Sequence, residues 1–210
     1  AVYAECLRLC AIETPDTHFF NLPNGLTAFA SKRFDRQNGM RIPMQSLAAY
    51  TGADYKVPGS LDYRNFLRAT LMCTQDVRER LHAFKRAVFN VLFNNRDDHT
   101  KNFSFLMEKN GQWKLAPAYD VTFCEGPGGY HQMDIMGEAL NIHRNDIHKL
   151  GTSEANLTTL EVDEIILTMR EIALQFSQIA QRLYPHQIRE STLQMIQSRI
   201  QQNIDFLTET

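Results

Sequence analysis

Residues 94–102 have the sequence Asn-Asn-Arg-Asp-Asp-His-Thr-Lys-Asn, and this stretch decides how the rest of the chain is interpreted. It follows an apolar stripe with helical spacing and precedes a short run with strand character. So many charged and carboxamide side chains are costly to bury unless water or a ligand satisfies them. Loops held between rigid elements are where catalytic side chains tend to lie. The stretch therefore predicts a functional loop.

The pattern around this loop predicts an α+β chain that is mainly helical. Helices are expected at 2–12, 44–50, 62–72, 77–93, 161–184 and 186–207, where apolar residues recur at spacings of three and four. Strands are expected at 17–22 and 26–33 around Pro23-Asn24-Gly25, and at 103–107 and 113–116 around a second turn. Residues 34–39 and 120–151 are expected to be irregular, and a loop as long as the second is usually functional or mobile.

Aromatic residues mark the expected contacts of the two hairpins. Phe19, Phe20 and Phe29 are expected to form a core for the first hairpin, since they lie within its predicted strands. Trp113 and Phe103 are expected to pack the second hairpin against the helices. We therefore expect both hairpins to have a buried side.

Composition excludes several classes of function. The chain has 210 residues, 43% of them hydrophobic, 22% charged, and a net charge of −2. This balance gives no electrostatic case for direct binding of nucleic acid or of an anionic membrane. Because no run of about 18 apolar residues occurs, no transmembrane helix is expected. The sequence thus predicts a globular protein with a sizeable core.

Cysteine and histidine spacing does not favour a metal site. Cys6 and Cys10 are four residues apart on a predicted helix, but Cys73 and Cys124 do not complete a ligand set, so buried free thiols are expected. A reducing, cytoplasmic location follows from free thiols. The irregular spacing of His131, Asp134, His143 and His148 favours exposed side chains over a metal centre.

Asp97 and Asn102 have the Asp-x₄-Asn spacing of a protein-kinase catalytic loop. In kinases, the aspartate accepts or orients the proton of the attacking hydroxyl, and the asparagine oxygen binds Mg²⁺. Asp120 follows the second hairpin and precedes a glycine-rich segment, which suits a second metal ligand. The spacing alone is weak, since Asp97 and Asp98 could equally form a turn or a cap.

The wider pattern resembles the HipA family of serine/threonine kinase toxins. The resemblance is carried by Asp97–Ser104, by Leu115–Val121 and by the upstream segment Lys32–Arg36. It implies a kinase-like fold with a mainly helical C-terminal lobe. On this basis residues 1–38 would form the end of the N-lobe and the hinge, and residues 39–210 the C-lobe.

Residue roles follow from this resemblance. Asp97 would be the catalytic base, and Asn102 and Asp120 would bind the Mg²⁺ that accompanies ATP. The segment from Lys32 to Phe34 would be the hinge that meets adenine.

Two further residues of the loop leave alternatives open. His99 and Lys101 would lie near the phosphates on the family pattern. His99 could instead cap the following strand, and Lys101 could pair with Asp97 or Asp98.

The resemblance also implies partners. Family members act in bacterial toxin–antitoxin systems, bind a DNA-binding antitoxin and phosphorylate translation proteins such as aminoacyl-tRNA synthetases. The sequence contains no glycine-rich phosphate loop and no strand lysine, which are N-terminal in the family. We expect them upstream or on a separate N-lobe-like subunit.

Two other functions remain open at this point. The chain could be a non-catalytic, kinase-derived fragment or subunit that acts by binding a partner protein. It could also be a metal-dependent phosphohydrolase that uses Asp97, Asp98 and His99, although such sites normally draw further ligands from separate strands.

Overall fold

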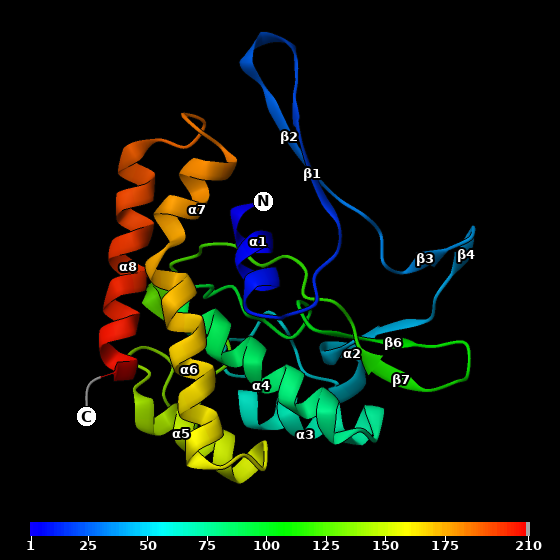
Figure 1. Cartoon of the computed structure of the whole chain (residues 1–210). Helices are drawn as coiled ribbons and strands as arrows, with labels where there is room; N and C mark the ends of the chain where they lie inside the picture. Colours follow the sequence, from blue (N-terminus) through cyan, green and yellow to red (C-terminus); the bar gives the residue numbers. More distant parts are fainter. Residues whose placement is uncertain (209–210) are drawn as a thin grey trace.

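The computed structural model describes residues 1–208, and helices form most of its body (Figure 1). The helices are α1 (Val2–Leu9), α2 (Leu47–Thr51), α3 (Tyr63–Thr74), α4 (Val77–Leu92), α5 (Arg144–Glu154), α6 (Thr159–Leu174), α7 (Phe176–Leu183) and α8 (Glu190–Thr208). The strands are β1 (Thr17–Asn21), β2 (Thr27–Ser31), β3 (Arg36–Gln37), β4 (Met40–Arg41), β5 (Met44–Ser46), β6 (Ser104–Met107) and β7 (Trp113–Leu115). Short 3₁₀ turns occupy Pro23–Gly25 and Pro127–Gly129.

Helix caps explain where several helices begin. The Asp62 carboxylate accepts a hydrogen bond from Asn65 N at the start of α3, and the Asp76 carboxylate accepts one from Arg78 N at the start of α4. Thr158 and Glu161 form a capping box on α6. Each cap satisfies backbone N–H groups that have no partner within the helix. The residues at the start of these helices therefore determine where they begin.

The core surrounds α4, as the apolar stripe predicts. The rings of Phe89 and Phe93 stack with their centroids 4.1 Å apart. The Tyr3 ring meets both edge-on, and its hydroxyl donates to Phe93 O at 2.6 Å. Aromatic pairs in these arrangements add to the free energy gained by burying the rings. This packing joins α1 to the end of α4, directly before the functional loop.

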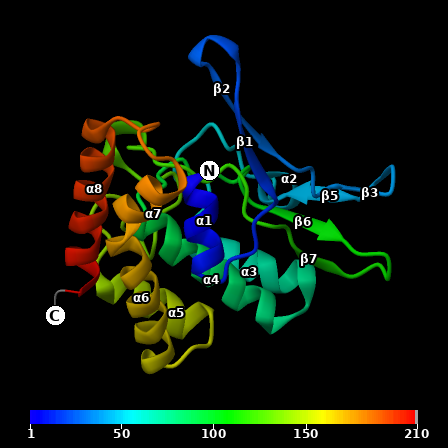
Figure 2. The same cartoon turned by 45° about the horizontal axis from the view of Figure 1, so that its top comes forward.

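The three-stranded antiparallel sheet contains a strand that the sequence prediction missed. Residues 44–46 form β5 rather than the first turn of a helix, and the strand order is β5-β6-β7 (Figure 2). Gln45 lies opposite Phe105, and Phe105 lies opposite Leu115. The predicted second hairpin is confirmed. The extra strand forms because β6 offers its free edge, a partner that lies far away in the sequence.

Other predicted boundaries were wrong. The helix expected over 161–184 is interrupted at Gln175, which separates α6 from α7. The stretch 120–151, expected to be irregular, contains the start of α5 at Arg144. The loop expected at 34–39 contributes to the small β3–β4 pair. Helical α5 is stabilised by a reciprocal cap between His143 and Asp146 and by packing on α6, which local propensity does not reveal.

The first hairpin does not have the expected core. Strands β1 and β2 project from the helical body (Figure 1), and the Phe20 and Phe29 residues are 50% and 54% exposed. Phe19 is half-buried and its ring meets Tyr184 at 4.9 Å. The prediction for Phe103 and Trp113 is confirmed, since Phe103 is buried and Trp113 packs against the core. A two-stranded ribbon can bury side chains only against a second layer.

The prediction of buried free thiols is confirmed for Cys6 and Cys10, whereas Cys73 and Cys124 are only half-buried. Cys6 and Cys10 are buried, and the four cysteines carry free thiols. Burial raises the pKa of Cys6 and of Cys10 to about 12.

Within residues 1–208, no helix has the length and apolar character needed to cross a lipid bilayer.

Candidate active site

The functional loop is anchored at the point where α4 ends. Asn94 adopts a left-handed conformation with φ of 53°, which turns the chain out of the helix. Arg96 N donates to Cys124 O at 3.2 Å, and Cys124 N donates to Asn94 O at 3.0 Å. Asn203 of α8 donates to Val91 O at 2.9 Å. Backbone and side-chain bonds therefore fix the loop before it reaches Asp97.

Asp98 is the buried anchor of the loop. Its side chain has no exposed surface, and it accepts hydrogen bonds from the Tyr63 hydroxyl at 2.7 Å and from Gln132 N at 2.8 Å. His131 Nδ1 lies 2.8 Å from the same carboxylate. Burial, and then the nearby Asp98 charge, raises the pKa of Tyr63 well above its usual range. Because its partners occupy both oxygens, Asp98 has a structural role.

This anchor corrects one prediction about the histidines. His131 is 3% exposed rather than free in solvent, because its ring is held against Asp98. His143 is exposed as predicted, while His148 is half-buried with Nε2 2.8 Å from Asp163. Among residues 1–208, no three His, Cys, Asp or Glu side chains gather into a metal site.

Asp97 and Asn102 are joined through the backbone of the loop. The Asp97 side chain is 44% exposed, and its Oδ1 accepts a hydrogen bond from Gln132 Nε2 at 2.9 Å. Asn102 is buried, and its Nδ2 donates to Asp97 O at 2.7 Å. That bond fixes which end of the carboxamide faces the loop. It leaves the Asn102 oxygen directed away from the Asp97 carbonyl, available as a ligand.

His99 and Lys101 lie on the side of the loop that faces residues 53–60. His99 Nε2 is 3.8 Å from Asp97 Oδ1. The Lys101 Nζ lies 3.5 Å from the centroid of the Tyr55 ring, and the Tyr55 and His99 rings are 5.7 Å apart. In the described part of the chain, Lys101 makes a cation–π contact rather than an ion pair with Asp97 or Asp98.

Asp120 follows β7 in a segment that the helical body holds tightly. The buried Arg86 guanidinium of α4 donates to Ala116 O, and Ala118 N donates to Glu13 O at 2.7 Å. Burial lowers the pKa of Arg86 to about 10. Asp120 itself is exposed and has a left-handed φ of 56°. Aspartate adopts this conformation more readily than most residues other than glycine.

Tyr119 links this segment to the functional loop. Its hydroxyl donates to Lys101 O at 2.6 Å and lies 2.6 Å from Ser104 Oγ. A small cavity is lined by Asn102, Tyr119 and Val121, the residue after Asp120. Burial raises the pKa of Tyr119, so its hydroxyl stays protonated as a donor at neutral pH. The residues around Asn102 and those around Asp120 therefore adjoin.

A larger cavity of about 630 Å³ joins Asp120 to the predicted hinge. Its lining includes Lys32, Phe34, Tyr119 and Asp120, and the rings of Phe34 and Tyr119 are 5.4 Å apart. Asp97 does not belong to this lining, but Tyr119, which does, donates a hydrogen bond to Lys101 O in the loop that contains Asp97. Segments 32–34 and 119–120, far apart in the sequence, thus share one pocket.

Both the sequence and the fold of this chain are similar to those of known proteins. Residues 1–183 match the model of the HipA-like C-terminal domain. The chain belongs to this family. The structure of HipA of Shewanella oneidensis, solved in complex with HipB and operator DNA, has a TM-score of 0.78 at 18% identity and covers 98% of this chain and 54% of that one.

Two further proteins are similar to this chain, one in fold and one in sequence. The Helicobacter pylori proinflammatory kinase CtkA has a TM-score of 0.64 at 12% identity, over 98% of this chain and 78% of that one. A Haemophilus influenzae protein named "Putative kinase" is 28% identical over 48% of this chain and 36% of its own length. The HipA-like chain thus spans about half of HipA and a smaller part of the curated relative. The predicted fold class and family resemblance are confirmed.

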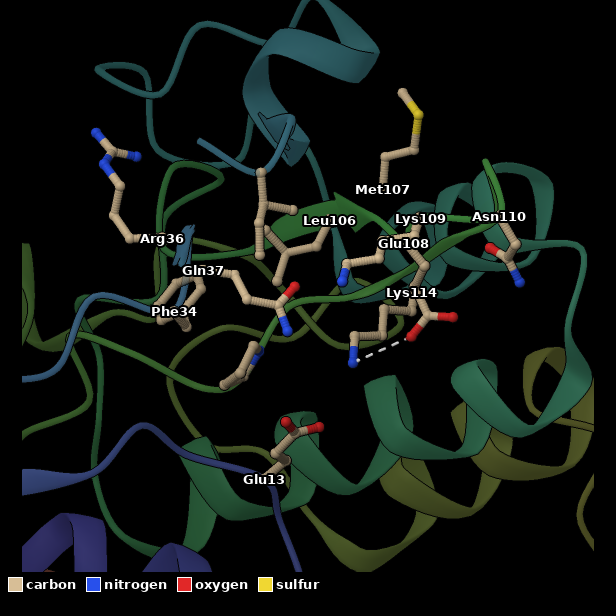
Figure 3. Close-up of a pocket in the computed structure, with 12 residues that line it drawn as sticks. Glu13, Phe34, Arg36, Gln37, Leu106, Met107, Glu108, Lys109, Asn110 and Lys114 are labelled. Atoms are coloured by element: carbon tan, nitrogen blue, oxygen red, sulfur yellow. Dashed lines mark ion pairs between the residues drawn. The ribbon is translucent and has the colours of Figure 1, made fainter. Parts of the chain in front are cut away.

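On the other side of Phe34, the HipA-like chain has a second cavity of about 570 Å³ (Figure 3). Glu13, Phe34, Gln37 and Lys114 are among the residues that line it. Lys114 Nζ pairs with Glu108 at 3.4 Å within it. Phe34 lines both cavities, so both reach the predicted hinge segment.

Sequence analysis missed several residues of this site. Tyr55, Tyr119 and Gln132 contact the functional loop from three different segments. Tyr119 lies within Leu115–Val121, one of the segments that carry the family resemblance, but the resemblance gave it no role of its own. Gln132 lies in the stretch 120–151 that was expected to be irregular, Tyr55 lies outside the predicted helices and strands, and neither belongs to a recognisable spacing. Only the folded path of the chain brings them to Asp97 and Lys101.

Proposed function

We propose that this HipA-like chain forms the catalytic part of an ATP-dependent serine/threonine protein kinase of a toxin–antitoxin system. Asp97 accepts or orients the proton of the substrate hydroxyl, and its exposed carboxylate suits that task. Residues 1–38 would supply the end of the N-lobe and the hinge, and residues 39–210 the C-lobe. Membership of the family and the fold shared with HipA and CtkA support the proposal.

The donor set fits Mg²⁺. Asn102 offers a carboxamide oxygen whose amide nitrogen is already committed to Asp97 O, and Asp120 offers an exposed carboxylate. Mg²⁺ prefers oxygen ligands and usually keeps waters and phosphate oxygens around few protein groups. When bound, the metal would neutralise charge on the transferred phosphate.

ATP would occupy the cavity that Phe34 and Asp120 share. Backbone groups of Lys32–Phe34 would hydrogen-bond adenine, and Asp120, which also lines this cavity, would mark where the phosphates end. His99 and Lys101 would contact phosphate oxygens, and Lys101 would have to leave the Tyr55 ring to do so. The shared cavity is the single observation that carries the proposal.

Partners are proposed from the relatives. HipA was solved with HipB and operator DNA, so a DNA-binding antitoxin is the proposed partner, and this chain itself would not bind nucleic acid. The proposed substrate is a translation-related protein such as an aminoacyl-tRNA synthetase, and the proposed location is the cytoplasm. A glycine-rich loop and a strand lysine would come from an upstream region or an N-lobe-like subunit.

Phosphate transfer from radiolabelled ATP tests this function in the full natural protein. Asp97→Asn should lower kcat by about 10²- to 10⁴-fold, the usual contribution of a general base, and leave the fold intact. Asp120→Ala should abolish Mg²⁺-dependent binding of ATP. Asp205→Asn, on the exposed face of α8, serves as the matched carboxylate control and should leave both properties unchanged. Near-normal transfer by Asp97→Asn would contradict the proposed role of the base.

A second function is favoured by one observation. The exposed Phe20 and Phe29 of the β1–β2 ribbon suit a non-catalytic, kinase-derived subunit that acts by binding another protein. Absence of any ATP-induced thermal shift at millimolar nucleotide in the full natural protein would support this alternative over the kinase.

A further inference from the structure

Gln132 is held through three of its polar groups. Its backbone N–H donates to Asp98 Oδ1 at 2.8 Å, and its carbonyl accepts from Gly59 N at 2.8 Å. Its side-chain Nε2 donates to Asp97 Oδ1 at 2.9 Å. His131, the preceding residue, is held on the same buried Asp98. Gln132 therefore connects the functional loop to the turn that contains Gly59 through hydrogen bonds.

The hydrogen bond from Gln132 leaves the two side-chain oxygens of Asp97 in different surroundings. Oδ1 accepts the Gln132 hydrogen bond and also faces His99 Nε2 at 3.8 Å. Among residues 1–208, no group donates a hydrogen bond to Oδ2. One oxygen is thus held by the protein, and the other is available to an incoming hydroxyl. A carboxylate fixed in this way has lost rotational freedom before the substrate arrives.

We propose that Gln132 is a positioning residue that orients Asp97 toward the hydroxyl of the protein substrate. This inference rests on the kinase function proposed above and adds a residue to its machinery. The side-chain amide cannot donate a proton to the reaction, so it acts only by holding Oδ1. Because the backbone bonds of Gln132 do not depend on its side chain, substitution should remove the orienting bond and keep the loop anchored.

Gln132→Met is the sharpest test, since methionine keeps the length of the side chain and removes the donor. In the full natural protein we expect kcat for transfer to the protein substrate to fall by about 10- to 100-fold, the scale of a misplaced reacting group. The KM for ATP and the Kd of ATP should stay within about twofold, because Gln132 does not line the cavity shared by Phe34 and Asp120.

The matched control is Gln201→Met on α8. Gln201 Nε2 likewise donates to a carboxylate, that of Asp205, at 2.8 Å, and both lie on the exposed helix. This variant should keep full kcat. An unchanged Tm of Gln132→Met would confirm that the loop is intact.

The outcomes separate the inference from the function on which it rests. An active wild-type protein in which Gln132→Met keeps full kcat overturns the positioning role alone. A Gln132→Met variant that loses Tm and ATP affinity together with kcat has a structural role, which also overturns it. A wild-type protein that transfers no phosphate overturns the kinase function and the positioning role together. A fall in kcat alone, with ATP affinity and Tm retained, supports both.

Discussion

The functional loop at 94–102 is polar and the β1–β2 ribbon at 17–31 is largely apolar, yet the loop is held by the core and the ribbon is not. The loop is anchored in the protein interior by its own residue Asp98, whose carboxylate has no exposed surface. The ribbon has exposed aromatic side chains and projects from the body (Figure 1). A polar segment becomes rigid when a core fixes it, while an apolar ribbon without a second layer gains little from its own side chains.

The strongest test of this contrast removes an aromatic ring from the helical body. Phe89 is fully buried on α4 and stacks on Phe93. Phe89→Ala should lower the free energy of unfolding by about 3–5 kcal/mol, because it removes buried apolar surface and leaves a cavity. Chemical denaturation monitored by circular dichroism would measure it. A loss below about 1 kcal/mol would show that the body is packed more loosely than described.

Substitution of Asp98, the buried anchor of the loop, should give the next largest loss in the free energy of unfolding. Asp98→Ala leaves the Tyr63 hydroxyl and Gln132 N without their acceptor in a buried site. We expect a loss of about 3 kcal/mol, since unsatisfied buried donors are costly. The same denaturation experiment applies, with the exposed Asp205→Ala as the control, and equal stability of the two variants would refute the anchor.

Alkaline pH should weaken the helical body through its buried thiols. The pKa of Cys6 and of Cys10 rises from 9.0 to about 12 on folding, so the folded state keeps protons that the unfolded state releases above pH 9. Their contribution to stability is therefore complete below pH 9 and is lost as pH rises from 9 toward 12, by about 1.4 kcal/mol per pH unit for each thiol. Replacing both cysteines by alanine should flatten this part of the stability profile.

The smallest effect is expected in the ribbon. Phe29→Ser changes a residue that is 54% exposed, so the free energy of unfolding should change by no more than about 0.5 kcal/mol. Phe89→Ser provides the matched buried variant. A loss from Phe29→Ser as large as that from Phe89→Ser would mean that the ribbon belongs to the core.

Much of the fold could be predicted because its signals are local. The apolar stripe of α4 and the carboxylate caps at Asp62 and Asp76 act within one or two turns of helix. Strand β5 and the break at Gln175 could not be predicted in this way. Strand β5 depends on its pairing with β6, many residues away, which overrides weak local preference.

The contacts of the candidate site also differ in whether they are local in the sequence or join distant segments. Asp97, Asn102 and Asp120 were identified from spacing and family resemblance, and their roles remain proposals. The hydrogen bond from Asn102 to Asp97 O spans only five residues and could have been anticipated from the loop. The bonds from Gln132 to Asp97 and from Tyr119 to Lys101 O join segments that no spacing rule connects.

The sequence by itself determined the helical body, the loop between α4 and β6, and the family to which the chain belongs. The tertiary structure decided which oxygen of Asp97 is held, which residues share a cavity with Asp120, and which aromatic residues are left exposed. The reason is physical. Helix periodicity and capping act over a few residues, whereas burial and side-chain contacts depend on the path of the whole chain.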